Sequence, residues 1–243
     1  MSFFKKLFKA DSVVTASKDA PEQVQRRLHQ RYPLNVSSLF VCESDLLGTL
    51  PVSNISHFGC FASVDNPEAL STEVSLPTMA NLRVAGFSKP IEIVKILPRA
   101  GGVGIAFKHG SIEDFHAMRD LMAPIHWGHT AVAIGEEPLA HGGVRSKFRG
   151  EGPFDLVLER DGSGAIRNLM LTFLTPGGVY ANVSFDGVDV VTSWAIDQVG
   201  VGSRMEQTTN VDEGLVRMGI IALLGMPQAF GQECASMLFQ HLK

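Results

Sequence analysis

Three arginines lie close together near the start of the chain, in the run Arg26-Arg27-Leu-His-Gln-Arg31. The planar guanidinium of arginine binds phosphate through two hydrogen bonds, and it also stacks on or donates to a nucleobase. Arg27 and Arg31 are four residues apart, so a helical turn or a tight wrap of the chain places both on one side. Arg26 adjoins them and can reach in from a bent backbone. The run therefore predicts a site for an anionic ligand with phosphates and planar bases.

A second polar group follows in the segment Asn54-Ile-Ser56-His-Phe-Gly59. The Asn54 side chain offers a carbonyl and an amide to the edge of a base, and Ser56 offers a hydroxyl. Gly59 permits a backbone conformation or a close approach that a side chain would prevent. If the segment is the end of a strand, Ile55 points the other way, into the core. Asn54, Ser56 and Gly59 are therefore candidate binding residues.

The elements that carry these residues are short and mostly extended. Pro21 opens a polar segment suited to a helix N-terminus, and Pro33 marks the change to extended chain. Strand-like runs rich in β-branched and apolar residues then follow, separated by turn signals at 65–67, 86–90 and 99–102. The runs are NVSSLFVCES, DLLGTLPVSNIS, GCFASV, STEVSLPTM, NLRVAGFSKPIEIVKIL and GVGIAFKH. This spacing predicts a small antiparallel barrel or sandwich, and the helical period of 111–122 predicts a helix that closes it.

The two motifs, in this order and with 22 residues between Arg31 and Asn54, resemble the RRxxxR and (D/N)xSxxG motifs of PilZ domains. The strand from Val103-Gly104 to Phe107 resembles the VGxxF strand of the same family. Each motif is weak alone, but together and inside a barrel pattern they are specific. The resemblance covers about residues 22–123, roughly half of the chain.

The resemblance implies a mainly β, α+β protein whose residues 21–123 form a six-stranded antiparallel barrel with a closing helix. It implies that the ligand is cyclic di-GMP, a bacterial second messenger. Arg27 and Arg31 would hold phosphate and guanine, and Arg26 would add a contact. Asn54 and Ser56 would read a guanine, and Gly59 would shape the turn.

The remainder of the chain predicts a tail over 1–20 and a second domain over 124–243, with Pro124 at the boundary. Four strand-like runs with hairpin turns at 161–164, 176–178 and 186–187 predict a β-meander. Two helices are expected to finish the chain, separated by Gly225-Met226-Pro227. We expect this α+β half to be an output or protein-interaction module.

Several signals carry little chemistry. His126, His129 and His141 lie in a stretch that looks like a loop and lacks a nearby acidic or thiolate partner, so no metal site is predicted. The pairs Glu136-Glu137 and Asp186/Asp189 are typical of turns. We find no catalytic constellation, so we expect a binding protein and not an enzyme, without a cofactor.

Composition sets the remaining expectations. The net charge of −4 disfavours DNA or RNA as a partner, since nucleic-acid binding favours a strongly basic surface. Three dispersed cysteines predict separate thiols in a reducing compartment. No apolar run approaches the ~20 residues that a membrane span needs, and the N-terminus does not resemble a secretion signal, so a cytoplasmic location is expected. Residues 3–9 combine apolar residues with three lysines, and a tail is favoured over peripheral membrane or partner contact.

Two functions from different classes remain open. The first is a cyclic di-GMP receptor that couples binding to a C-terminal output in motility, attachment, polysaccharide or virulence control. The second is a PilZ-like protein-interaction or assembly module that does not depend on a nucleotide. Without a ligand-binding role, the arginine run would be a solvated helix face, and the segment from Asn54 to Gly59 would be an ordinary turn at the end of a strand.

Overall fold

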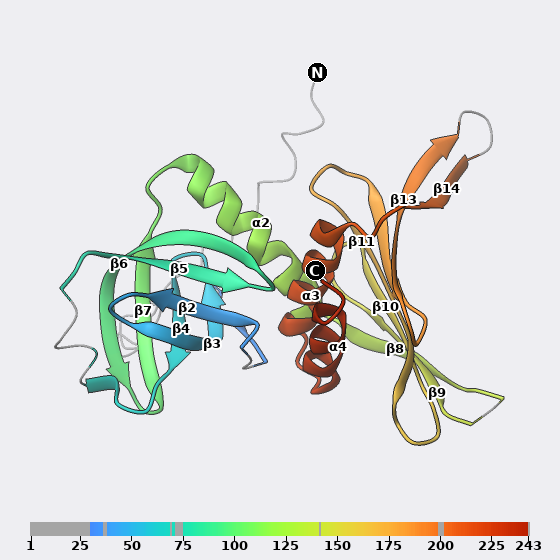
Figure 1. The fold of residues 1–243 in the computed structure, drawn as a ribbon, viewed down its shortest axis with the longest axis horizontal. Coiled ribbons are helices and arrows are strands. Elements are labelled where there is room, and N and C mark those ends of the chain that lie inside the picture. The colour runs from blue at the N-terminus through green and yellow to red at the C-terminus, as the bar shows by residue number, and fades with distance from the viewer. Residues whose placement is uncertain are drawn as a thin grey trace, which may run out of the picture.

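The computed structural model describes most of the chain as two β-sheets separated by helices (Figure 1). The described residues are 30–35, 38–68, 70, 75–140, 142–198 and 202–242. Arg26, Arg27, His141 and the predicted tail lie outside these ranges. Among the described residues, no helix is long and apolar enough to cross a membrane.

The first sheet closes into a six-stranded antiparallel barrel, as predicted. Its strands are β2 (Phe40–Ser44), β3 (Gly48–Ser56), β4 (Gly59–Ser63), β5 (Thr78–Val84), β6 (Phe87–Arg99) and β7 (Gly102–Lys108). They follow the order β3-β2-β5-β6-β7-β4, and a direct β3–β4 pairing closes the ring. Alternate residues of each strand point inward, which is clearest in β5, where Ala80, Leu82 and Val84 are buried between exposed neighbours.

A seventh strand, β1 (Tyr32–Pro33), lies outside the ring and pairs antiparallel with β3. The same sheet also holds two of the three cysteines side by side. All three thiols are free and buried, but Cys42 and Cys60 share a hydrogen bond inside the barrel. The prediction of separate thiols is therefore confirmed, because none of the three is in a disulfide.

The helix after the barrel, α2 (Ile112–His129), begins where predicted and ends later. Ser111 is its N-cap and accepts a hydrogen bond from the Asp114 amide. The helix was expected to end near Met122, but it continues through Pro124 to His129. Its last turns cross α3, and this packing stabilises a segment whose local sequence argues for a break.

The second sheet is antiparallel and has seven strands in the order β14-β13-β12-β11-β10-β9-β8. The four predicted meander strands are its centre, and three further strands were missed. Its members are β8 (Val132–Pro138), β9 (Val144–Arg149), β10 (Phe154–Arg160), β11 (Ile166–Leu174), β12 (Tyr180–Phe185), β13 (Val190–Gln198) and β14 (Gly202–Gln207). The pair Glu136-Glu137 belongs to β8, so its assignment to a turn was also wrong.

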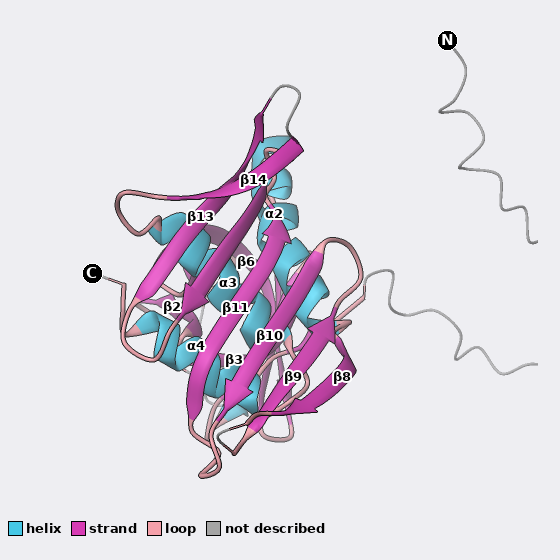
Figure 2. Cartoon of the chain, turned by 90° about the vertical axis from the view of Figure 1, so that its right-hand side faces the viewer, coloured by secondary structure: helices cyan, strands magenta, loops and turns pink. Residues whose placement is uncertain are grey.

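The two predicted C-terminal helices are present as α3 (Glu213–Gly225) and α4 (Phe230–Phe239). With α2 they form a layer between the barrel and the second sheet (Figures 1 and 2). One face of this sheet packs on the helices through apolar residues such as Leu156, Leu171 and Val183. The other face has no described segment over it, and Figure 2 looks onto it.

Candidate functional site

The segment Asn54–Gly59 covers the end of β3, the tight turn at His57 and Phe58, and the start of β4. Ser56 and Gly59 are paired residues in the register, and the Ser56 hydroxyl donates to the Gly59 carbonyl at 3.0 Å. Ser56 is buried, so its hydroxyl braces the turn and keeps lone pairs for accepting. A Cβ on Gly59 would lie 2.7 Å from the carbonyl oxygen of Ile105 on β7. Glycine is therefore required here by the close approach of a neighbouring backbone.

Asn54 is aimed by an irregularity in β3. The register with β4 shifts between Val52 and Asn54, and such a bulge re-aims the side chains beside it. The Asn54 Oδ1 atom is buried and accepts no hydrogen bond from any described residue. An unsatisfied buried acceptor costs about 1–3 kcal/mol, so a donor that reached this oxygen after a local rearrangement would recover that free energy.

Arg31 lies beside this turn because of strand pairing. Tyr32 pairs with Ile55 and Pro33 with Asn54, which places Arg31, one residue earlier, at the Ser56 end of β3. The Arg31 side chain is exposed. A hydrogen bond with Cys42 and burial raise the pKa of the Cys60 thiol well above its usual value, and the Arg31 charge opposes this rise. The Arg31 guanidinium therefore lies close enough to Cys60 to interact electrostatically with β4 as well as with β3.

The predicted site residues thus divide into two groups. Arg31, Asn54, Ser56 and Gly59, although separated in sequence, come together at one end of the barrel. Arg26 and Arg27 fall outside the described residues, so their place in the site stays a prediction.

The two residues inside the turn, His57 and Phe58, connect it to the start of α2. The His57 ring stacks on Phe115 with centroids 5.8 Å apart, and Phe58 lies 6.1 Å from the same ring. The His57 carbonyl accepts a hydrogen bond of 2.7 Å from the His109 ring. A change in the conformation of the β3–β4 turn would therefore directly alter its contacts with the first turn of α2.

An ion pair fixes the same end of α2 to the barrel. Lys89 of β6 is buried and donates to the carboxylate of Asp114, an interaction that lowers the Asp114 pKa. A carboxylate with a lowered pKa stabilises the fold above its ordinary pKa, and this contribution disappears as the pH falls through the folded value.

We therefore expect Asp114→Asn to lower the free energy of unfolding at neutral pH. The difference in this free energy between wild type and variant should shrink as the pH falls below about 4. Urea midpoints of wild type and variant, measured from pH 7 to pH 3, check this. In a Lys89→Met background, Asp114→Asn should lose most of this pH dependence, because the partner charge is gone. Parallel midpoint curves for wild type and Asp114→Asn over the whole range would contradict the expectation.

The segment after Arg31 links the site to the C-terminal half. Tyr32 packs edge-on against His126 and His129, with ring centroids 5.6 and 5.5 Å away. The Asn35 backbone amide donates to the Leu224 carbonyl, and its side chain donates to the Met226 carbonyl at 2.9 Å. A strap of five residues therefore connects the arginine beside the turn to the last turn of α2 and to the α3–α4 connection.

His126 and His129 were predicted to lie in a loop, and this was wrong, because they form the last turn of α2. The His126 Nε2 atom lies 3.2 Å from the Glu151 carboxylate. Among the described residues, no group of three His, Cys, Asp or Glu side chains is placed to hold a metal ion. Their position instead makes them packing partners of Tyr32 at the junction.

A second tie joins the barrel to α3. The Arg217 side chain donates to the Ala85 carbonyl at 3.1 Å and also binds Glu213. Ala85 and Gly86 form the β5–β6 turn with positive φ angles of 47° and 81°. A Cβ on Gly86 would meet the Arg217 guanidinium, so glycine keeps room for this contact.

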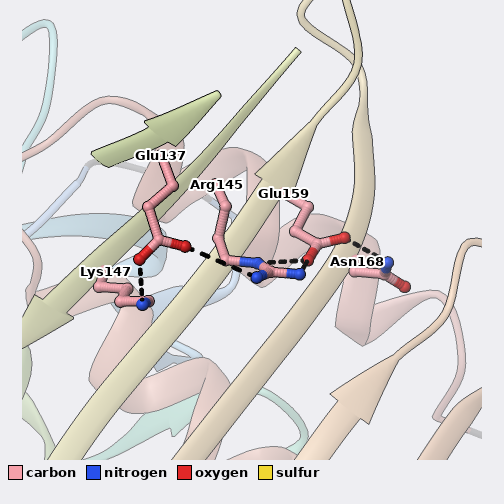
Figure 3. Close-up of polar contacts among 5 residues, drawn as sticks. All are labelled: Glu137, Arg145, Lys147, Glu159 and Asn168. Carbon is pink, nitrogen blue, oxygen red and sulfur yellow. Dashed lines mark hydrogen bonds and ion pairs between the residues drawn. The ribbon is translucent and has the colours of Figure 1, made fainter. Parts of the chain in front are cut away.

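The outer face of the second sheet carries a charged network that the sequence did not reveal (Figure 3). Arg145 of β9 binds Glu159 of β10 at 2.6 Å and approaches Glu137 of β8 at 3.6 Å. Lys147 binds Glu137, and these two cations hold the Glu137 pKa below its usual range. Asn168 of β11 donates to the other oxygen of Glu159. Charge therefore alternates from β8 to β10, and the neutral Asn168 of β11 ends the network.

This network borders a shallow depression of about 450 Å³ that extends to Met170 and Ser184. Both carboxylates of the network are engaged by donors, which suits them to binding more than to proton transfer. The signal that could have found the surface is the period-2 alternation of charge in β9 and β10, which depends on knowing the register.

Comparisons with models of protein families, with curated proteins and with solved structures found no match. The chemistry of the site must therefore be inferred from the residues of this chain.

Proposed function

We propose that the barrel half is a PilZ-type receptor for cyclic di-GMP. The observation that carries the proposal is the β1–β3 register, which brings Arg31 beside Asn54, Ser56 and Gly59. Residues that resemble two separate family motifs are thereby neighbours in space, at an exposed end of the barrel.

The chemistry of the ligand suits these groups. The Arg31 side chain is exposed, so its guanidinium donors can reach phosphate or the acceptor edge of guanine. The N1–H and N2–H donors of a guanine are the kind of group that the buried Oδ1 of Asn54 lacks. Arg27 and Arg26, four and five residues before Arg31, would supply the further cations that two phosphates need.

Coupling to the C-terminal half follows from the contacts of the site. Ligand held by Arg31 would change the free energy of the strap through Tyr32 and Asn35, and ligand on the turn would act on α2 through His57 and Phe58. A ligand that prefers one arrangement of these contacts shifts the population toward it. We propose that the output is a protein partner bound in the cytoplasm by the C-terminal half, in motility, attachment, polysaccharide or virulence control, without catalysis.

The alternative, a protein-interaction module that needs no nucleotide, is favoured by the charged outer face of the second sheet. The two functions differ in what they require of Arg31 and Asn54. The first requires ligand at these residues, and the second leaves them without a role.

A thermal-shift panel on the full chain separates the two functions. Cyclic di-GMP at about 100 times its dissociation constant should stabilise the fold by about 2.7 kcal/mol, a rise of roughly 5–10 °C in Tm. Cyclic di-AMP and GTP at equal concentration serve as controls and should give little change. No shift with cyclic di-GMP up to about 1 mM, or an equal shift with every nucleotide, would favour the second function.

A further inference from the structure

The two edges of the second sheet differ in how they are protected. Exposed edge strands offer unpaired backbone groups to other chains, and proteins usually block them with bulges, prolines or like charges. The edge strand β8 has all three: a register shift between Ala133 and Gly135, Pro138 at its end, and the like charges Glu136 and Glu137. The edge strand β14 pairs with β13 without a register shift and has no proline.

The backbone of β14 is arranged for further pairing. Thr208 donates to the Thr192 carbonyl at 2.9 Å, which continues the register that pairs Gln207 with Ser193. Hydrogen-bonded and non-hydrogen-bonded pairs alternate in an antiparallel ladder. Arg204 and Glu206 therefore exchange their backbone hydrogen bonds with β13. The backbone groups of Ser203, Met205 and Gln207 face the outer edge, where no described strand pairs with them.

The side chains of β14 are ordered so that the strand complements itself. In an antiparallel pair of two β14 strands centred on Met205, Arg204 lies opposite the partner's Glu206, and Glu206 lies opposite the partner's Arg204. Both pairs occupy non-hydrogen-bonded positions, where facing side chains are closest. Within one chain these two side chains are highly exposed, at 61% and 53%, and their own ion pair spans 3.6 Å. Met205, 40% exposed on the other face, would pack against its equivalent.

We propose that two copies of this chain associate through β14, antiparallel and about a two-fold axis at Met205. The two seven-stranded sheets then form one continuous sheet, an isologous contact of the kind that closes a dimer. In Figure 1 the β13–β14 hairpin extends past the helical layer. One short strand buries less surface than a standard interface of about 1,200–2,000 Å², so the dimer is weak, with a dissociation constant on the order of 10 μM.

Charge reversal tests the pairing. Sedimentation velocity of the wild type from about 1 to about 300 μM should show a mass that rises from 26.3 kDa toward twice that value. Arg204→Glu and Glu206→Arg each place like charges opposite one another and should weaken the dimer at least tenfold. The double variant Arg204→Glu/Glu206→Arg restores opposite charges and should recover wild-type association.

The matched control is Glu136→Arg on the other edge, which should leave association unchanged. Backbone hydrogen exchange adds a second measurement that needs no substitution: the Met205 amide should be protected at high protein concentration and not at low. A wild type that stays monomeric at 300 μM overturns the proposal. So does a double variant as weak as the single variants, or a dimer lost in Glu136→Arg. None of these outcomes depends on the nucleotide.

Discussion

The Arg31→Ala variant should bind cyclic di-GMP about 30 to 150 times more weakly than wild type, and Arg27→Ala should behave alike. Each change removes charge-assisted hydrogen bonds worth about 2–3 kcal/mol in total, and every 1.4 kcal/mol is tenfold in affinity. Isothermal titration calorimetry on the full chain measures the change directly. Arg31→Lys keeps the charge but loses the planar fork, so it should recover only part of the affinity.

The matched control is Arg99→Ala. Arg99 is an exposed arginine that donates to the adjacent Pro98 carbonyl. Arg99 is the last residue of β6 and lies beside the β6–β7 turn. Gly102, which follows that turn, pairs with Ser63 at the end of β4 opposite to Gly59, so Arg99 lies at the other end of the barrel from the candidate site. Its removal changes the net charge as Arg31→Ala does, without touching the site, and should leave the affinity unchanged. Equal affinity of wild type, Arg27→Ala and Arg31→Ala for cyclic di-GMP would contradict the proposed ligand site.

Gly128→Ala should destabilise the protein by about 3 kcal/mol, which lowers Tm by roughly 6–12 °C. In an ordinary helix the same change stabilises by about 1 kcal/mol, because alanine has the higher helix propensity. Here a Cβ would lie 1.8 Å from the Ala222 carbonyl oxygen of α3. Backbone cannot move aside as a flexible side chain can, so the α2–α3 crossing must open.

Gly135→Ala serves as the control for Gly128→Ala. No atom lies within 4 Å of the position of its Cβ, so its effect should stay within about 0.5 kcal/mol. Urea denaturation of both variants at the same pH provides the comparison. A Gly128→Ala variant as stable as Gly135→Ala would contradict the tight crossing, and with it the physical link between the barrel and the second sheet.

Much of the secondary structure was readable from local patterns. Alternation of buried and exposed residues is a property of a strand and its two faces, so runs such as β7 and β10–β13 were recognisable without knowing their partners. The hairpin turns and the break between α3 and α4 are likewise set by glycine and proline at particular positions.

Other elements carry no such local signal. Every residue of β8 is exposed, so the strand has no buried face and no alternation to read. The continuation of α2 through Pro124 depends on packing against α3, where Gly128 and Gly225 allow two helices to approach closely. Tertiary contact outweighs helix propensity at such positions.

The candidate site shows the same division. The sequence alone supplied the residue types that suit a dinucleotide, namely the arginine run and the turn from Asn54 to Gly59. Their meeting depends on the β1–β3 register, a pairing between residues more than twenty positions apart that no local pattern encodes. The contacts of Tyr32 with α2 and the charged outer face are likewise products of pairing and packing, because each joins residues that are remote in sequence. The place of β14 at the edge of the described sheet is also decided by strand pairing.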